Sequence, residues 1–151
     1  MSYRFVCKQF TELSIHELYD ILNLRNEVFV LEQNCVFVDT DYKDQKAWHL
    51  MLYNEDSALL GYTRLIPEGI SYPNYTSIGR VVNHPAFRNQ GVGKLIMEKS
   101  IDMIYELFGK NYSIKIGAQL YLEKFYESFG FKRVGNVYDE DGIDHIHMIK
   151  A

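Results

Sequence analysis

The sequence predicts an α/β (α+β) fold: a mixed central sheet of about six to seven strands with helices on both faces. Three observations support this prediction. The 151 residues suit a single domain spanning residues 1–151. Segments with strand-like patterns alternate with helical ones along the chain. A strand–helix–strand block over residues 77–118 predicts a parallel pair, because parallel neighbours need a crossover connection.

The N-terminal part is expected to supply a strand and a helix. Alternating apolar residues predict a strand over residues 3–9. Ser14 opens the helix, because Glu17 lies three residues on and completes a capping box. The expected apolar stripe of this helix comprises Ile15, Leu18, Leu22 and Phe29.

The middle of the chain is predicted to form a hairpin and then a further strand. Residues 47–53 and 59–66 have strand patterns, and the turn-rich segment 54–57 joins them. Residues 77–82 form the next strand, which ends before Pro85 because proline cannot donate to a sheet ladder.

The C-terminal part is predicted to complete the crossover and to end in two strands. In order, we expect a helix over 93–108 that stops at Gly109, a strand over 113–118, a helix over 121–129 that stops at Gly130, and strands near 131–138 and 145–149.

Composition limits the classes of protein to which the chain can belong. Apolar residues make up 47% and the net charge is only −4, which excludes disorder and disfavours a nucleic-acid partner. The longest uncharged apolar stretch, 47–53, falls short of the roughly 20 residues that span a membrane, so no membrane partner is expected. The absence of a signal-peptide pattern, with Cys7 and Cys35 as the only cysteines, predicts a cytoplasmic location.

The segment Arg88-Asn89-Gln90-Gly91-Val92-Gly93-Lys94 lies between a predicted strand and a helix. Glycines allow backbone N–H groups to converge, and a helix N-terminus favours an anion. It is not a P-loop, because Arg88 stands where the first glycine is required. It is not a dinucleotide fingerprint either, since Ile96 replaces the third glycine. By itself the segment is equally compatible with a turn that binds nothing.

Two motifs together indicate a known superfamily. Residues 88–93 resemble the acetyl-CoA loop of the GCN5-related N-acetyltransferases (GNAT), whose pattern is Q/R-x-x-G-x-G/A, and residues 126–131 (YESFGF) resemble its Y-x-x-x-G-F ending. Within the superfamily, four segments are similar to the ElaA family: 25–33 (R-x-x-V-F-V-x-E-Q), 47–50 (AWHL), 78–82 (IGRVV) and 140–145 (E-D-G-I-x-H). Autoinducer synthases share the fold and a similar R-x-x-V-F piece.

The resemblance implies a splayed pair formed by the strands 77–82 and 113–118, with the pantetheine arm of acetyl-CoA between them. It implies cofactor contacts from the backbone of Val81, Val82 and Asn83, from the loop Arg88, Asn89, Gln90, Gly91, Val92, Gly93 and Lys94, and from Gln119 and Tyr126. Many relatives have asparagine where Gln119 stands. Tyr126 is also implied as the general acid that protonates the departing thiolate.

The amine site is less well defined, because the strand 77–82 contains no carboxylate to act as base. Two acidic segments are interpreted either as an approach path for a cationic amine or as hydrated loops: Glu32, Asp39, Asp41 and Asp44, opposed only by Lys43, and Asp139, Glu140, Asp141 and Asp144. The candidate substrate-binding residues are Glu32, Asp41, His49, Asp139, Asp141 and His145, of which Glu32, Asp41, His49 and His145 are candidate bases. The alternative is that the amine loses its proton through water, without a dedicated base.

The predicted function is therefore a cytoplasmic N-acetyltransferase that uses acetyl-CoA and transfers acetyl directly to a primary amine in a ternary complex. The amine belongs to a small molecule or a peptide, and the protein is expected to be a monomer or homodimer. No metal is expected, because His145-x-His147 lacks further ligands of suitable spacing. Two alternatives remain: a non-catalytic regulatory module that binds acyl-CoA, and an acyltransferase of the autoinducer-synthase type.

Overall fold

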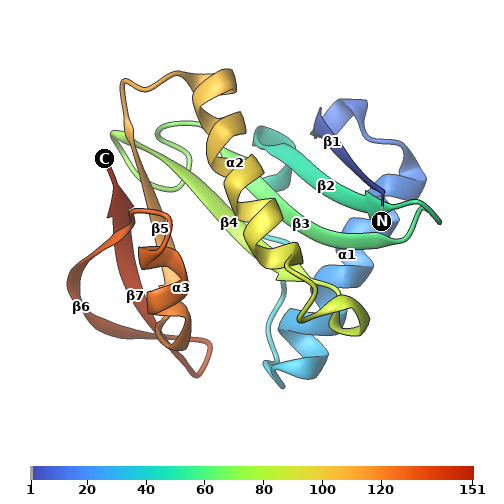
Figure 1. Cartoon of the computed structure of the whole chain (residues 1–151). Coiled ribbons are helices and arrows are strands. Elements are labelled where there is room, and N and C mark those ends of the chain that lie inside the picture. The colour runs from blue at the N-terminus through green and yellow to red at the C-terminus, as the bar shows by residue number, and fades with distance from the viewer. Residues whose placement is uncertain (1) are drawn as a thin grey trace.

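The computed structural model describes residues 2–151 as one seven-stranded sheet with helices packed on both faces (Figure 1). The strand order is β1-β2-β3-β4-β5-β7-β6, and every neighbouring pair is antiparallel except β4 and β5. The mixed α/β fold predicted from the sequence is confirmed. The strands are β1 (Tyr3–Gln9), β2 (Trp48–Asn54), β3 (Leu59–Ile66), β4 (Tyr75–Asn83), β5 (Ser113–Gln119), β6 (Lys132–Glu140) and β7 (Ile143–Lys150). The α-helices are α1 (Ile15–Arg25), α2 (Val92–Phe108) and α3 (Glu123–Glu127).

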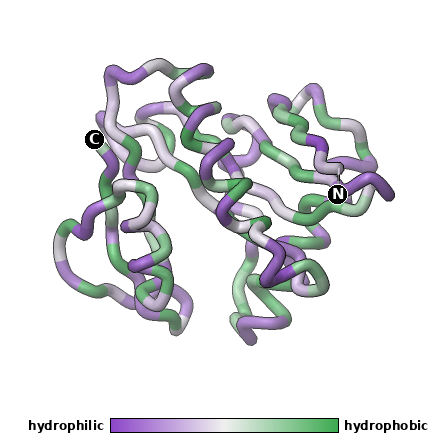
Figure 2. Tube along the Cα trace, in the orientation of Figure 1, coloured by the Kyte–Doolittle hydropathy of each residue, from purple (hydrophilic) through white to green (hydrophobic). Residues whose placement is uncertain are grey.

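The sheet separates two hydrophobic clusters. Along β2, Leu50 and Leu52 pack with α2 and α3, whereas Met51 and Tyr53 pack with α1 on the opposite face. This alternation follows from the two-residue period of a strand. Because both faces are covered, β3 is buried along its whole length, and Figure 2 shows hydrophilic segments in the loops and on the helices.

The buried face of α1 differs from the predicted stripe. Ile15 is 80% exposed, while Ile21, Leu24 and Val28 are buried. Apolar residues occupy two adjacent faces of this helix, and periodicity alone does not show which of them meets the sheet. The helix then continues as a π-helix, Asn26–Glu32, which changes the phase on which the prediction relied.

The third helix is shorter than the predicted 121–129. The segment starts as a 3₁₀ turn, Leu120–Leu122, and α3 covers only Glu123–Glu127. Gly130 follows with a φ of +95°, and its N–H donates to the Glu127 carbonyl at 2.9 Å. This glycine ends the helical segment as expected.

Within residues 2–151, no helix is both long enough and apolar enough to cross a membrane.

Candidate active site

The parallel strands β4 and β5 separate after two residue pairs. Tyr75 pairs with Ser113 and Thr76 pairs with Ile114, after which β5 continues to pair with β7 alone among the described strands. Figure 1 shows the two strands diverging, as the predicted splayed pair requires. Beyond Thr76, the edge of β4 that faces β5 therefore offers backbone groups to an extended ligand, which is the geometry of β-augmentation.

A β-bulge accompanies this separation. Tyr62 pairs with Val82 and Arg64 with Gly79, so β4 holds one more residue than β3 in the same interval. Arg80, within the bulge, has a φ of +48°. Its Nε donates to Asp39 Oδ1 at 2.8 Å, and Nη2 donates to the Asp39 carbonyl at 2.8 Å. Because a bulge bends its strand, this anchored residue directs the end of β4 away from β5.

The glycine-rich loop leads into α2. Gly91 is the N-cap residue, with a φ of +78°, and its carbonyl accepts the N–H of Leu95 at 3.1 Å. The N–H groups of the first helical turn therefore remain available, and the helix dipole adds positive potential there. Figure 2 shows that the chain is hydrophilic where it turns into this helix.

Gly93 and Asn83 show that this region can accommodate a ligand. A Cβ atom on Gly93 would lie 2.9 Å from Asn83 Nδ2, so glycine makes room for the amide. Asn83 Oδ1 is buried and has no hydrogen-bond partner among the described residues. A buried acceptor without a partner beside free helix N–H groups fits the binding of coenzyme A at the predicted place.

We expect Gly91→Val to weaken acetyl-CoA binding by well over about ten-fold, because a β-branched residue resists the positive φ and a Cβ would obstruct the anion's approach. Calorimetry measures the affinity. Gly109→Val is the matched control, since Gly109 has the same φ of +78° at the other end of α2. Unchanged affinity in a folded Gly91→Val protein would mean that the loop does not hold the pyrophosphate.

A cleft of about 1120 Å³ lies along the opening between the two halves of the sheet. Among the residues singled out from the sequence, it is lined by Glu32, Asp41, Val81, Val82, Asn83, Arg88, Gly93, Gln119, Tyr126, Asp141 and His145. The remaining loop residues Asn89, Gln90, Gly91, Val92 and Lys94 lie outside the lining. Val92 is buried in the core, so only its backbone N–H can serve a ligand.

The first acidic segment is neutralised by arginines, contrary to the expectation that only Lys43 opposes it. Arg25, fully buried, donates to Asp39 and Asp44 at 2.7 Å each. Arg64 donates to both oxygens of Asp41 at 2.8 Å and to Asp44 at 3.0 Å. With Arg80, these residues form an arginine–carboxylate cluster beneath the cleft. It holds the β4 bulge and supplies no net acidic field.

Asp41 and Glu32 are both engaged by arginines. Burial alone would raise the pKa of Asp41, but hydrogen bonds and charge from Arg64 outweigh it and lower the pKa to about 2. Glu32 accepts from both terminal nitrogens of Arg88, at 2.7 and 2.5 Å, and these bonds lower its pKa. This ion pair links the end of the π-helix to the glycine-rich loop.

Two other candidates lie away from the cleft. His49 is only 1% exposed, with Nδ1 2.6 Å from the Tyr62 hydroxyl and Nε2 2.8 Å from the Asp44 carbonyl. Burial lowers the pKa of His49. Asp139 is exposed and accepts the Gly142 N–H at 3.3 Å in the β6–β7 turn. Neither His49 nor Asp139, both candidates for the amine site, lines the cleft.

Tyr126 is buried at the cleft wall, 6% exposed, on α3. Its ring packs edge-on against Phe125 at 5.2 Å and against Phe131 at 6.2 Å. Burial raises the pKa of Tyr126, so its hydroxyl stays protonated at neutral pH. The hydroxyl can therefore act as a proton donor.

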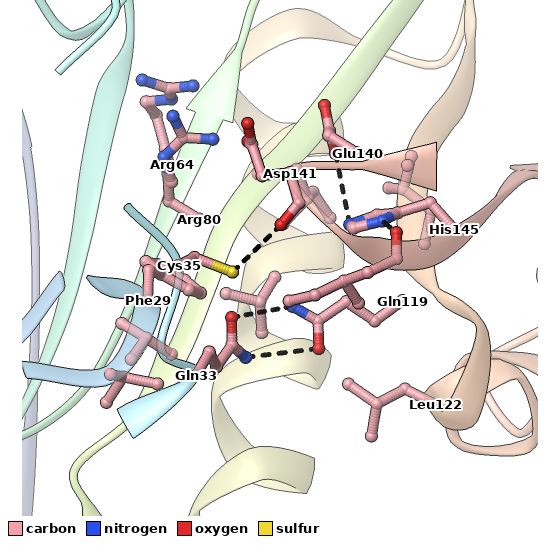
Figure 3. Close-up of a pocket in the computed structure, with 18 of the residues that line it drawn as sticks. Phe29, Gln33, Cys35, Arg64, Arg80, Gln119, Leu122, Glu140, Asp141 and His145 are labelled. Atoms are coloured by element: carbon pink, nitrogen blue, oxygen red, sulfur yellow. Dashed lines mark hydrogen bonds and ion pairs between the residues drawn. The ribbon is translucent and has the colours of Figure 1, made fainter. Parts of the chain in front are cut away.

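Two contacts join the segment after the π-helix to the other half of the molecule (Figure 3). The side-chain amides of Gln33 and Gln119 exchange hydrogen bonds of 3.3 and 3.2 Å. The Cys35 thiol donates to the Asp141 carbonyl at 3.3 Å. Gln119 therefore already has an amide partner within the protein.

Comparison with known proteins identifies the family. The family model described as an acetyltransferase (GNAT) domain matches residues 25–151. The chain belongs to the GNAT acetyltransferase family. The UPF0039 protein of Schizosaccharomyces pombe is 40% identical to this GNAT chain over 144 residues, which are 95% of this chain and 94% of that protein.

Solved structures agree with this assignment. An acyl-CoA N-acyltransferase from Pseudomonas aeruginosa has a TM-score of 0.92 at 37% identity, covering 99% of this GNAT chain and 100% of that one. Escherichia coli ElaA has a TM-score of 0.91 at 34% identity, with the same coverage. The predicted resemblance to GNAT proteins and to ElaA is therefore confirmed.

Several residues that shape this GNAT cleft have no role predicted from the sequence, notably Arg25, Gln33, Arg64 and Arg80. Arg25 and Gln33 lie in the R-x-x-V-F-V-x-E-Q segment, so the sequence showed the motif but not what its residues do.

Within residues 2–151, no group of three or more histidine, cysteine or acidic side chains could hold a metal ion. His147 packs instead against the Tyr138 ring, with centroids 4.6 Å apart.

Proposed function

We propose that this GNAT domain transfers the acetyl group of acetyl-CoA to a primary amine, directly and within a ternary complex. One observation carries the proposal: a single cleft is lined by residues of the open β4 strand, by Gly93 at the start of α2 and by Tyr126. These would supply, in order, a surface for an extended arm, a site for an anion, and a proton donor.

The residues that would hold acetyl-CoA follow from this arrangement. The backbone of Val81, Val82 and Asn83 would pair with the pantetheine arm, and N–H groups from Gln90 to Lys94 would bind the pyrophosphate. When bound, acetyl-CoA supplies an activated thioester. A backbone N–H near Val82 would stabilise negative charge that develops on the thioester oxygen.

Tyr126 would donate its proton toward the departing sulfur.

Direct transfer is supported by the state of Cys35, the cysteine that lines the cleft, because its thiol donates to the Asp141 carbonyl. A nucleophilic cysteine needs to be a thiolate, which a positive neighbour or a base stabilises. We therefore propose no covalent acyl-enzyme.

The amine would approach past the β6–β7 turn. Glu140 and Asp141 line the cleft there, whereas the acids of the first segment are paired with arginines. A cationic amine, carried by a small molecule or a peptide, suits this end of the cleft.

We propose that the protein acts in the cytoplasm, which is supported by the free thiols of Cys7 and Cys35.

The test is thiol release from acetyl-CoA with putrescine, spermidine, kanamycin, lysine and glutamate, with products identified by mass spectrometry. We expect release to depend on the amine, to match the acetylated product, and to favour cationic amines over glutamate. Tight acetyl-CoA binding without turnover on any amine would indicate the non-catalytic module. Turnover only with S-adenosylmethionine as acceptor would indicate the autoinducer-synthase alternative.

A further inference from the structure

His145 occupies a position between the two sides of the cleft. It lies on β7, paired with Gln119 on β5 and with Tyr138 on β6. It is 7% exposed and lines the cleft. The Tyr138 ring covers one side of the imidazole, with centroids 5.7 Å apart. Figure 3 shows His145 beside Glu140 and close to the Gln33–Gln119 amide pair. The imidazole is thus held by strands and not by a mobile loop.

The contacts of the ring define its tautomer. Nδ1 lies 2.7 Å from the Ile143 carbonyl oxygen. A carbonyl only accepts hydrogen bonds, so Nδ1 must carry a hydrogen, and in the neutral ring the lone pair is on Nε2. Nε2 lies 3.2 Å from Glu140 Oε2. A lone pair and a carboxylate do not attract one another, so this contact is that of the doubly protonated ring, and Nε2 can accept a proton from the amine once it has released this one to solvent.

The other candidate bases are engaged elsewhere. Arg88 binds both oxygens of Glu32, and Arg64 binds both oxygens of Asp41. Both nitrogens of His49 have partners, and the residue is outside the cleft lining. Of the four groups that the sequence offered, His145 combines a place on the cleft with a nitrogen that can accept a proton.

We infer that His145 is the proton acceptor for the attacking amine and that Glu140 stabilises the imidazolium that forms. This inference rests on the proposed function. In the ammonium form of the amine one N–H bond breaks, its electron pair stays on nitrogen as the lone pair that attacks the thioester carbonyl, and the proton bonds to the lone pair of Nε2. The Glu140 side chain is 58% exposed, so the pair connects the cleft to solvent, through which the proton leaves.

Several titratable groups surround His145. Glu140 and Tyr138 face it from β6, and Asp141 follows Glu140 in the turn. His147 lies two residues along β7, where Lys115 of β5 and Glu140 also act on it, and burial lowers the pKa of His147. His147 belongs to the same strand face but not to the cleft lining, so it provides a matched control.

The experiment compares His145→Gln with His147→Gln, using acetyl-CoA and the fastest amine among putrescine, spermidine, kanamycin and lysine. We expect His145→Gln to lower kcat by about 10²–10⁴-fold, the usual contribution of a positioned base, with unchanged acetyl-CoA affinity by calorimetry. His147→Gln should stay close to the wild-type rate.

Two further variants separate a chemical role from a structural one. Added imidazole should restore part of the turnover of His145→Ala, which it would not do if the residue served packing alone. Glu140→Gln, at an exposed position, should lower kcat less than His145→Gln. If wild-type protein acetylates amines and His145→Gln keeps the wild-type rate, the inference is overturned and the proposed function stands. If wild-type protein acetylates none of the amines, the proposed function falls and this inference with it.

Discussion

Replacing Tyr126 with phenylalanine should lower turnover by about 10²–10⁴-fold, the usual yield of general acid–base help. Burial raises the pKa of Tyr126, so the hydroxyl holds its proton until a basic sulfur develops beside it. The ring, which packs against Phe125 and Phe131, remains in the variant, so the fold and the acetyl-CoA affinity should change little. Thiol-release kinetics and calorimetry measure the two quantities separately.

Tyr112→Phe is the matched control for this change, because Tyr112 is 40% exposed and outside the cleft lining. It should have the wild-type rate. Undiminished turnover in Tyr126→Phe would show that the thiolate leaves without this proton. A loss of acetyl-CoA affinity would instead make Tyr126 a binding residue.

Replacing Arg25 with methionine should lower the free energy of unfolding by about 3 kcal/mol, the lower end of the range for breaking a buried ion pair. The change leaves Asp39 and Asp44 in the interior without their shared partner. Arg80 and Arg64 still contact these carboxylates, which is why the lower end applies. Urea denaturation measures the effect.

Arg133→Met provides the comparison, because Arg133 pairs with Glu123 at the surface. Exposed ion pairs contribute little to stability, so this variant should unfold at nearly the wild-type urea concentration. If Arg25→Met were no less stable than Arg133→Met, the arginine–carboxylate cluster would not be the support of the β4 bulge.

The parts of the fold that depend on local pattern could be predicted from sequence. The capping box at Ser14 is present, with Glu17 N–H donating to Ser14 Oγ at 3.0 Å. The glycine-rich loop does lead into a helix, α2. The face of α1 was wrong, because apolar residues on two sides of a helix leave its orientation open until the sheet is known.

The parts of the site that depend on long-range pairing could not be predicted. Arg25 lies 14 residues from Asp39, and Arg80 lies 41 residues from it. Counting charges along the chain therefore left the first acidic segment opposed only by Lys43. The sequence placed His145 among four candidate bases, but only the distances to Ile143 and Glu140 define its tautomer.

Initial-rate kinetics with both substrates varied, and with both products quantified, test the central claim most directly. Acetyl-CoA is titrated at several fixed concentrations of the best amine, and free coenzyme A and acetylated amine are measured together. We predict intersecting double-reciprocal lines and equal amounts of the two products, as direct transfer in a ternary complex requires. Parallel lines, which indicate a covalent acyl-enzyme, or coenzyme A released without acetylated amine, would contradict it.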